Sequence, residues 1–84
     1  MSTIYTGSVE DRVKQCIHEI TGVSLADIQP SYLLVNDLGL DSIELLETAM
    51  AIESEFDVEI SDCEGEAVRT VQDAIDIVRS KVQP

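Results

Sequence analysis

The stretch DLGLDSIELLETAMAIESEF, residues 37–56, decides the fold, because a helical pattern begins at one identifiable residue inside it. Asp41 and Glu44 have the spacing of a capping box, in which each side chain accepts a hydrogen bond from the backbone N–H of the other residue. We therefore predict a helix with Asp41 as its N-cap that continues to about Phe56. Ser42 is then the first helical residue, and its hydroxyl is free to face solvent because Asp41 does the capping.

The apolar residues of this helix predict one buried face and one outer face. The expected core stripe, with Leu46 at its flank, consists of Leu45, Ala49, Ile52 and Phe56. Ile43 and Met50 fall on another side of the helix, close to Glu47. Glu53 falls near the core arc of an ideal helix, so we expect either a distorted last turn or a different register there.

Two further helices and one short helix are predicted around this central one. Apolar residues at i, i+4, i+7, i+8 and i+11 from Val9 indicate a helix over about 8–20, which Ser8 can cap and Gly22 can end. Thr70 and Asp73 begin a last helix, and the polar stretch at 61–69 leaves room for at most one helical turn. The expected fold is all-α, a small four-helix bundle with three principal helices and one short helix.

The segment from Val23 to Leu40 has neither strand alternation nor a sustained helical period, and it contains Pro30 and Gly39. It is nevertheless rich in leucine, so we expect an ordered long loop that packs over the bundle, with a short turn near 25–28. Loops of this length in compact domains usually have a function. Residues 1–7 are expected to form a flexible lead, and residues 8–84 the single domain.

The charge of the chain is strongly one-sided. Seventeen acids against five bases give a formal net charge of −12, and the stretch between Gln15 and Val68 holds thirteen acids without a Lys or Arg. Such a surface repels nucleic acid and anionic membranes and attracts a basic partner protein. It is also compatible with a charge that only keeps a small protein soluble.

Catalytic and metal sites are poorly supported by the residues. The chain has one histidine, His18, which nothing in the sequence fixes near Ser42 and which we expect to be solvated. Cys16 and Cys63 lack the paired spacing of a metal or redox motif, and Cys16 is expected to be a reduced core residue. No metal site is predicted, because the EF-hand order is missing from the acids at Asp57, Glu59, Asp62, Glu64 and Glu66.

Three interpretations of Ser42 remain from position alone: an ordinary surface serine, a nucleophile and an attachment point. A serine in the first turn of a helix can hold a phosphodiester against free backbone N–H groups and the positive end of the helix dipole. A nucleophile would need a base, and G-L-D-S-I is not the motif of a nucleophile elbow. Attachment is therefore the active interpretation to weigh against an ordinary serine.

Residues 37–60, DLGLDSIELLETAMAIESEFDVEI, closely resemble the acyl carrier proteins, whose signature is D-L-G-x-D-S-[LI] followed by an acidic helix. The resemblance extends through the first helix pattern and through TVQDAIDIV, residues 70–78, so it covers essentially the whole fold. The D-S-[LI] triplet alone would be weak evidence. Length, acidity and the E-x-E-F-D-x-E-I ending make the combination specific.

The resemblance implies a carrier in which Ser42, next to Asp41, receives 4′-phosphopantetheine from coenzyme A through a phosphopantetheinyl transferase. The thiol of that arm would carry acyl intermediates between enzymes of fatty acid or polyketide synthesis. In the family, acids on the helix that follows the serine contact basic patches of those enzymes. The matching acids in this chain are Asp41, Glu44, Glu47 and Glu53. Ile43 and Met50 would add apolar contact. The family shelters the acyl chain between helices, at aliphatic positions that match Leu45, Leu46, Ile52 and Ile60.

Some positions depart from the common family pattern and favour a specialised carrier as the alternative within the family. They are Leu40 and Leu45, each bulkier or more apolar than usual, and Ser54, where an acid is frequent. Two alternatives from other classes are an aminoacyl or peptidyl carrier and an acidic interaction domain that is never modified. We expect a cytoplasmic monomer with no catalysis of its own, no nucleic-acid partner and no stable membrane insertion, because no signal peptide or transmembrane stretch is visible.

Overall fold

The computed structural model describes residues 8–82, so the predicted N-terminal lead lies outside the described residues. Within them the elements are α1 (Val9–Thr21), the 3-10 turn η1 (Leu25–Asp27), α2 (Ser42–Phe56), α3 (Asp62–Ala67) and α4 (Val71–Val82). Across residues 8–82 the only strand-like pairing is one isolated bridge between Leu33 and Thr70. The predicted all-α fold, with three principal helices and one short helix, is confirmed.

Paired side chains at positions i and i+3 define where α2, α3 and α4 begin. At α2, Asp41 Oδ1 accepts from Glu44 N at 2.8 Å, and Glu44 Oε1 accepts from Asp41 N at 3.2 Å. The same reciprocal capping box starts α3, and at α4 Asp73 N donates to Thr70 Oγ1 at 3.0 Å. Each pair satisfies N–H groups that the first helical turn leaves without an intrahelical acceptor.

α1 shows why its boundaries were readable from sequence. Ser8 Oγ accepts from Asp11 N at 3.3 Å at the start, and Gly22 ends the helix in the left-handed region, with φ of 76°. The Gly22 N–H donates to His18 O, as expected of a glycine C-cap. The observed helix lies within one residue of the predicted one at each end.

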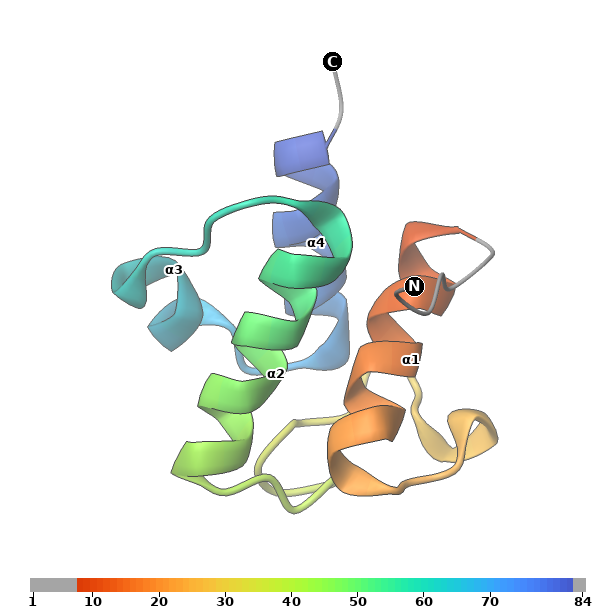
Figure 1. Ribbon diagram of the computed structural model, residues 1–84. Helices are drawn as coiled ribbons and strands as arrows, with labels where there is room; N and C mark the ends of the chain where they lie inside the picture. The colour runs from red at the N-terminus through yellow and green to blue at the C-terminus, as the bar shows by residue number, and fades with distance from the viewer. Residues whose placement is uncertain (1–7, 83–84) are drawn as a thin grey trace.

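The long segment between α1 and α2 crosses the end of the bundle where α1 ends and α2 and α4 begin (Figure 1). It is tied to the start of α4 by hydrogen bonds from Leu34 N to Arg69 O at 2.9 Å and from Val71 N to Tyr32 O at 3.1 Å. Ile28 and Leu34 are buried in the core. The expectation of an ordered loop with a turn near 25–28 is therefore correct.

The buried core is aliphatic apart from Cys16. Its buried side chains come from α1, the loop, α2 and α4, and they are Val13, Cys16, Ile17, Ile28, Leu34, Ile52, Val71, Ala74, Ile75 and Val78. Cys16 is a free, buried thiol, and burial raises its pKa to about 11. The prediction of a reduced core cysteine is thus confirmed.

Arg12 joins α1 to the last turn of α2. Arg12 Nε donates to Glu55 Oε2 at 2.9 Å, and Arg12 also donates to the Glu55 backbone oxygen at 3.2 Å. The guanidinium carbon lies 4.3 Å from the centre of the Phe56 ring, within cation–π distance. Arg12 therefore fixes the C-terminal end of α2 against α1.

None of the described helices is both long enough and apolar enough to cross a membrane.

Candidate functional site

The start of α2 is held by a compact turn that precedes it. Leu33 O accepts from Asp37 N and Leu38 N, and Leu40 N donates to Leu34 O at 3.0 Å. Leu40, two residues before Ser42, is buried, with only 2% of its surface exposed. The buried leucine and the capping box together fix the position of an exposed Ser42 at the end of the bundle.

The first turn of α2 can accommodate a negative group. Asp41 already occupies the Glu44 N–H, whereas the N–H groups of Ser42 and Ile43 have no acceptor among residues 8–82. Unpaired N–H groups and the helix dipole both favour an anion at this end of a helix. The prediction that Asp41 caps the helix and leaves the Ser42 side chain exposed is confirmed.

The outer face of α2 carries an apolar strip. Ile43, Leu46 and Met50, at i, i+3 and i+7, are 69%, 62% and 57% exposed. We call these three residues the outer strip. Glu47 is also exposed, and it is a neighbour of both Ile43 and Met50 on the helix surface, because it lies four residues after Ile43 and three before Met50. The sequence predicted Ile43 and Met50 on this side, but it assigned Leu46 to the inner flank and to the acyl-chain pocket.

Leu46 is therefore separated from the other three predicted pocket residues. Ile52 is buried in the core, and Leu45 and Ile60 pack against that core from α2 and from the segment before α3. These three residues face the interior. Leu46 instead faces solvent, with 62% of its surface exposed. The i, i+3, i+7 spacing of Leu46 with Ile43 and Met50 is the signal that could have placed it correctly.

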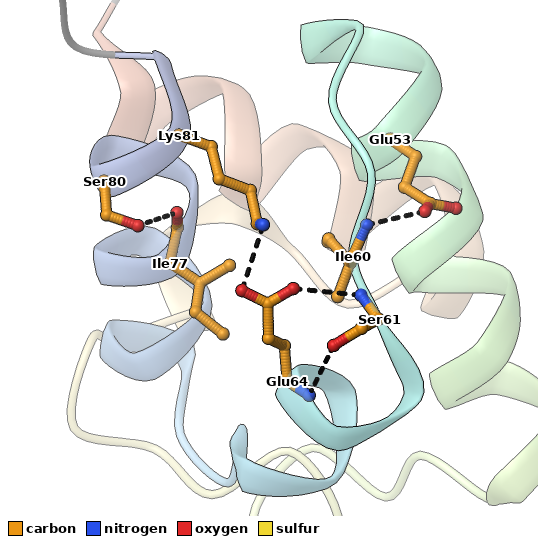
Figure 2. Close-up of polar contacts among 7 residues, drawn as sticks. All are labelled: Glu53, Ile60, Ser61, Glu64, Ile77, Ser80 and Lys81. Carbon is orange, nitrogen blue, oxygen red and sulfur yellow. Dashed lines mark hydrogen bonds and ion pairs between the residues drawn. The ribbon is translucent and has the colours of Figure 1, made fainter.

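Glu53 differs from the outward acids that the sequence grouped it with. It is half-buried, and its carboxylate turns to the α2–α3 connection, where Oε2 accepts from Ile60 N at 2.7 Å (Figure 2). The sequence left open a distorted last turn or a different register, and the distortion does not occur, because α2 stays α-helical to Phe56. The side chain satisfies a backbone N–H near the core arc, which explains why an acid is tolerated there.

A shallow open hollow lies beside Glu53, between the α2–α3 connection, α3 and the end of α4. On its α4 side Lys81 Nζ is 3.0 Å from Glu64 Oε2, while Glu64 Oε1 accepts from Ser61 N (Figure 2). The backbone hydrogen bond from Ser61, and then the hydrogen bond from Lys81, lower the pKa of Glu64. Glu64 thus connects the start of α3 to the C-terminal turn of α4.

His18, the single histidine of the chain, lies against a backbone carbonyl group. His18 is half-buried, with Nδ1 2.7 Å from the Val23 carbonyl oxygen, so the expectation of a solvated histidine is wrong. The interaction with Val23 occupies one of its two ring nitrogens. Within residues 8–82, no group of three or more His, Cys, Asp or Glu side chains is arranged to hold a metal ion.

Both the sequence and the structure of this chain resemble known proteins. Residues 11–78 match the family model described as the phosphopantetheine attachment site. A solved structure from Mycobacterium tuberculosis, assigned as an acyl carrier protein, is 30% identical and superposes with a TM-score of 0.83. The match covers 87% of this chain and 97% of that one.

The chain belongs to the acyl carrier protein family. The group that such a phosphopantetheine-binding domain carries is a covalently attached 4′-phosphopantetheine.

Proposed function

We propose that this acyl carrier protein carries acyl intermediates as thioesters on a 4′-phosphopantetheine arm attached to Ser42. The observation that carries this proposal is the exposed position of Ser42 at the first residue of α2, where Asp41 supplies the cap. When bound, the arm supplies a terminal thiol to which the acyl group is linked. Ser42 Oγ would form the phosphodiester, and the Ser42 and Ile43 N–H groups would stabilise its charge.

The outer strip and the acids around it support docking of basic partner enzymes. Glu47 is exposed beside Ile43 and Met50, so it can meet an Arg or Lys while the strip supplies apolar contact. Glu44 is half-buried and its Oε1 is engaged in the capping box, and Glu53 is engaged with Ile60. Among the predicted docking acids we therefore assign the main contribution to Glu47, with Asp41 next to the attachment serine.

The proposed partners are a phosphopantetheinyl transferase and enzymes of fatty acid or related lipid or polyketide synthesis. The interior face that includes Leu45, Ile52 and Ile60 supports sheltering of an aliphatic chain, which favours acyl cargo over aminoacyl or peptidyl cargo. The free thiols of Cys16 and Cys63 support a reducing compartment, the cytoplasm. In this role the protein performs no bond chemistry itself and presents its cargo to other enzymes.

Loading with coenzyme A and a phosphopantetheinyl transferase tests the proposal. Intact mass should rise by one phosphopantetheine in the wild type and in Ser54→Ala, which changes an exposed serine of the same helix. Ser42→Ala should show no gain, while its free energy of unfolding changes by no more than about 0.5 kcal/mol. Loading that persists in Ser42→Ala, or a wild type that gains no mass, would contradict the assignment. Mass spectrometry of the native thioester then distinguishes an acyl group from an aminoacyl group.

A further inference from the structure

Thr48, in the middle of α2, is the buried polar residue of the part of the chain that the structure describes, with 4% of its surface exposed. Its hydroxyl oxygen has no hydrogen-bond partner within residues 8–82. A buried hydroxyl without a partner is destabilising, because it loses its hydrogen bonds to water and gains none in exchange. Valine has nearly the same shape and would avoid this cost, so the hydroxyl at this position calls for an explanation.

The usual local solution for a helical threonine is absent at Thr48. Threonine hydroxyls inside helices commonly donate to the carbonyl oxygen four residues earlier. Thr21 in α1 does this, with its Oγ1 2.8 Å from Ile17 O. Because Thr48 does not satisfy its hydroxyl in this way, the group is available to a partner that the free protein does not contain.

The position of Thr48 places that hydroxyl beside the proposed cargo. Thr48 lies three residues after Leu45 and four before Ile52, so the three side chains are neighbours on one face of α2. Leu45 packs against the core and Ile52 is part of it. Thr48 is six residues from Ser42, a distance of about 9 Å along the helix axis. An acyl chain that contacts Leu45 and Ile52 would therefore pass the Thr48 hydroxyl.

We propose that Thr48 selects the cargo by hydrogen bonding to an oxygen on the acyl chain. The preferred cargo would then be an acyl chain that bears a hydroxyl or keto group, rather than a saturated chain of the same length. A hydroxyl side chain suits both groups, since it can donate to a ketone and can donate to or accept from an alcohol. This inference rests on the proposed carrier function.

The test compares two cargoes of equal length in wild type and in Thr48→Val. A phosphopantetheinyl transferase loads octanoyl or 3-hydroxyoctanoyl groups from the corresponding coenzyme A thioesters, and intact mass confirms loading. In wild type the 3-hydroxyoctanoyl form should melt above the octanoyl form by about 4–8 °C, the shift expected of one hydrogen bond in a domain of this size. In Thr48→Val the difference should disappear or reverse, while Thr21→Val should keep it.

The unloaded proteins supply a second measurement. Thr48→Val should melt at or above the wild-type temperature, because it removes an unpaired buried hydroxyl without creating a cavity. A drop of several degrees would show that the hydroxyl has a partner within the protein and would overturn the inference. Equal melting temperatures of the two loaded wild-type forms, or the same difference in Thr48→Val, would also overturn it. A wild type that cannot be loaded would instead contradict the carrier function itself.

Discussion

Asp41 and Ser42 are adjacent, yet the structure gives them separate tasks. The Asp41 carboxylate accepts a hydrogen bond from the N–H of Glu44, the third residue of α2, at 2.8 Å. It thereby satisfies one of the backbone N–H groups that have no acceptor within the helix. Ser42 contributes no capping bond and stays exposed. The order aspartate then serine therefore gives a stable helix start and a free hydroxyl at the same point.

Asp41→Ala should remove this cap and lower the free energy of unfolding by about 1 kcal/mol. Asp41→Asn is the matched control: it keeps a side-chain acceptor at the N-cap and should stay within a few tenths of a kcal/mol of the wild type. Thermal melts followed by circular dichroism measure both variants. Equal destabilisation by alanine and asparagine would show that the charge, and not the hydrogen bond, is what matters at this position. We also expect slower phosphopantetheine transfer to Asp41→Ala, because the serine would be less well positioned.

At the scale of the element, α2 has three parts with different surroundings. Its start presents Ser42, its inner face contributes Ile52 to the core, and its outer strip is left exposed. An exposed strip of large apolar side chains beside an acid is the composition expected of a docking surface rather than of a purely solvated face. The last turn is fixed from two sides, by Arg12 at Glu55 and by Glu53 at Ile60.

Glu47→Lys should weaken binding to a phosphopantetheinyl transferase by roughly three- to ten-fold, because it replaces an attractive exposed charge pair by a repulsive one. Glu19→Lys makes the same change in net charge at an exposed position of α1 and should have a smaller effect. Titration calorimetry at low and high salt measures both, and wild-type affinity should fall as salt rises. Salt-independent binding, or equal losses in the two variants, would argue against docking at α2.

At the scale of the whole molecule, the excess of acidic residues should lower the stability of the folded state. The thirteen acids between Gln15 and Val68 have no Lys or Arg among them in sequence, and the folded bundle brings them within a small volume. Among residues 8–82 three ion pairs are formed, each with a base from outside that stretch. Two of them reach an acid inside it and partly offset the repulsion: Arg12 with Glu55 and Lys81 with Glu64. Self-repulsion at neutral pH should therefore be a measurable part of the stability balance.

Millimolar Mg²⁺ or Ca²⁺, or moderate NaCl, should raise the melting temperature by reducing this repulsion. Calorimetric melts at matched ionic strength separate general screening from an additional effect of divalent ions. A melting temperature that does not respond to either salt would mean that repulsion between the acids contributes little.

The sequence by itself determined the local features of this protein. Helix starts at Asp41 and Thr70 and the helix end at Gly22 follow from hydrogen bonds between residues close in the chain, so short motifs predict them. The free hydroxyl of Ser42 was also predictable, because the neighbouring Asp41 supplies the cap. The family signature likewise lies in one continuous stretch, which is why the resemblance was visible without a structure.

Only the tertiary structure decided which side chains face inward and which polar groups remain unpaired. Leu46 lies between the core stripe and the outer strip on an ideal helix, so the sequence allows both positions, and the packed bundle leaves it exposed. Glu53 and His18 find partners at Ile60 and Val23 through connections whose paths no periodicity describes. Thr48 is buried without a partner for the same reason: burial and pairing depend on the direction of neighbouring elements, which is set by packing across the whole bundle and not by the order of residues along one helix.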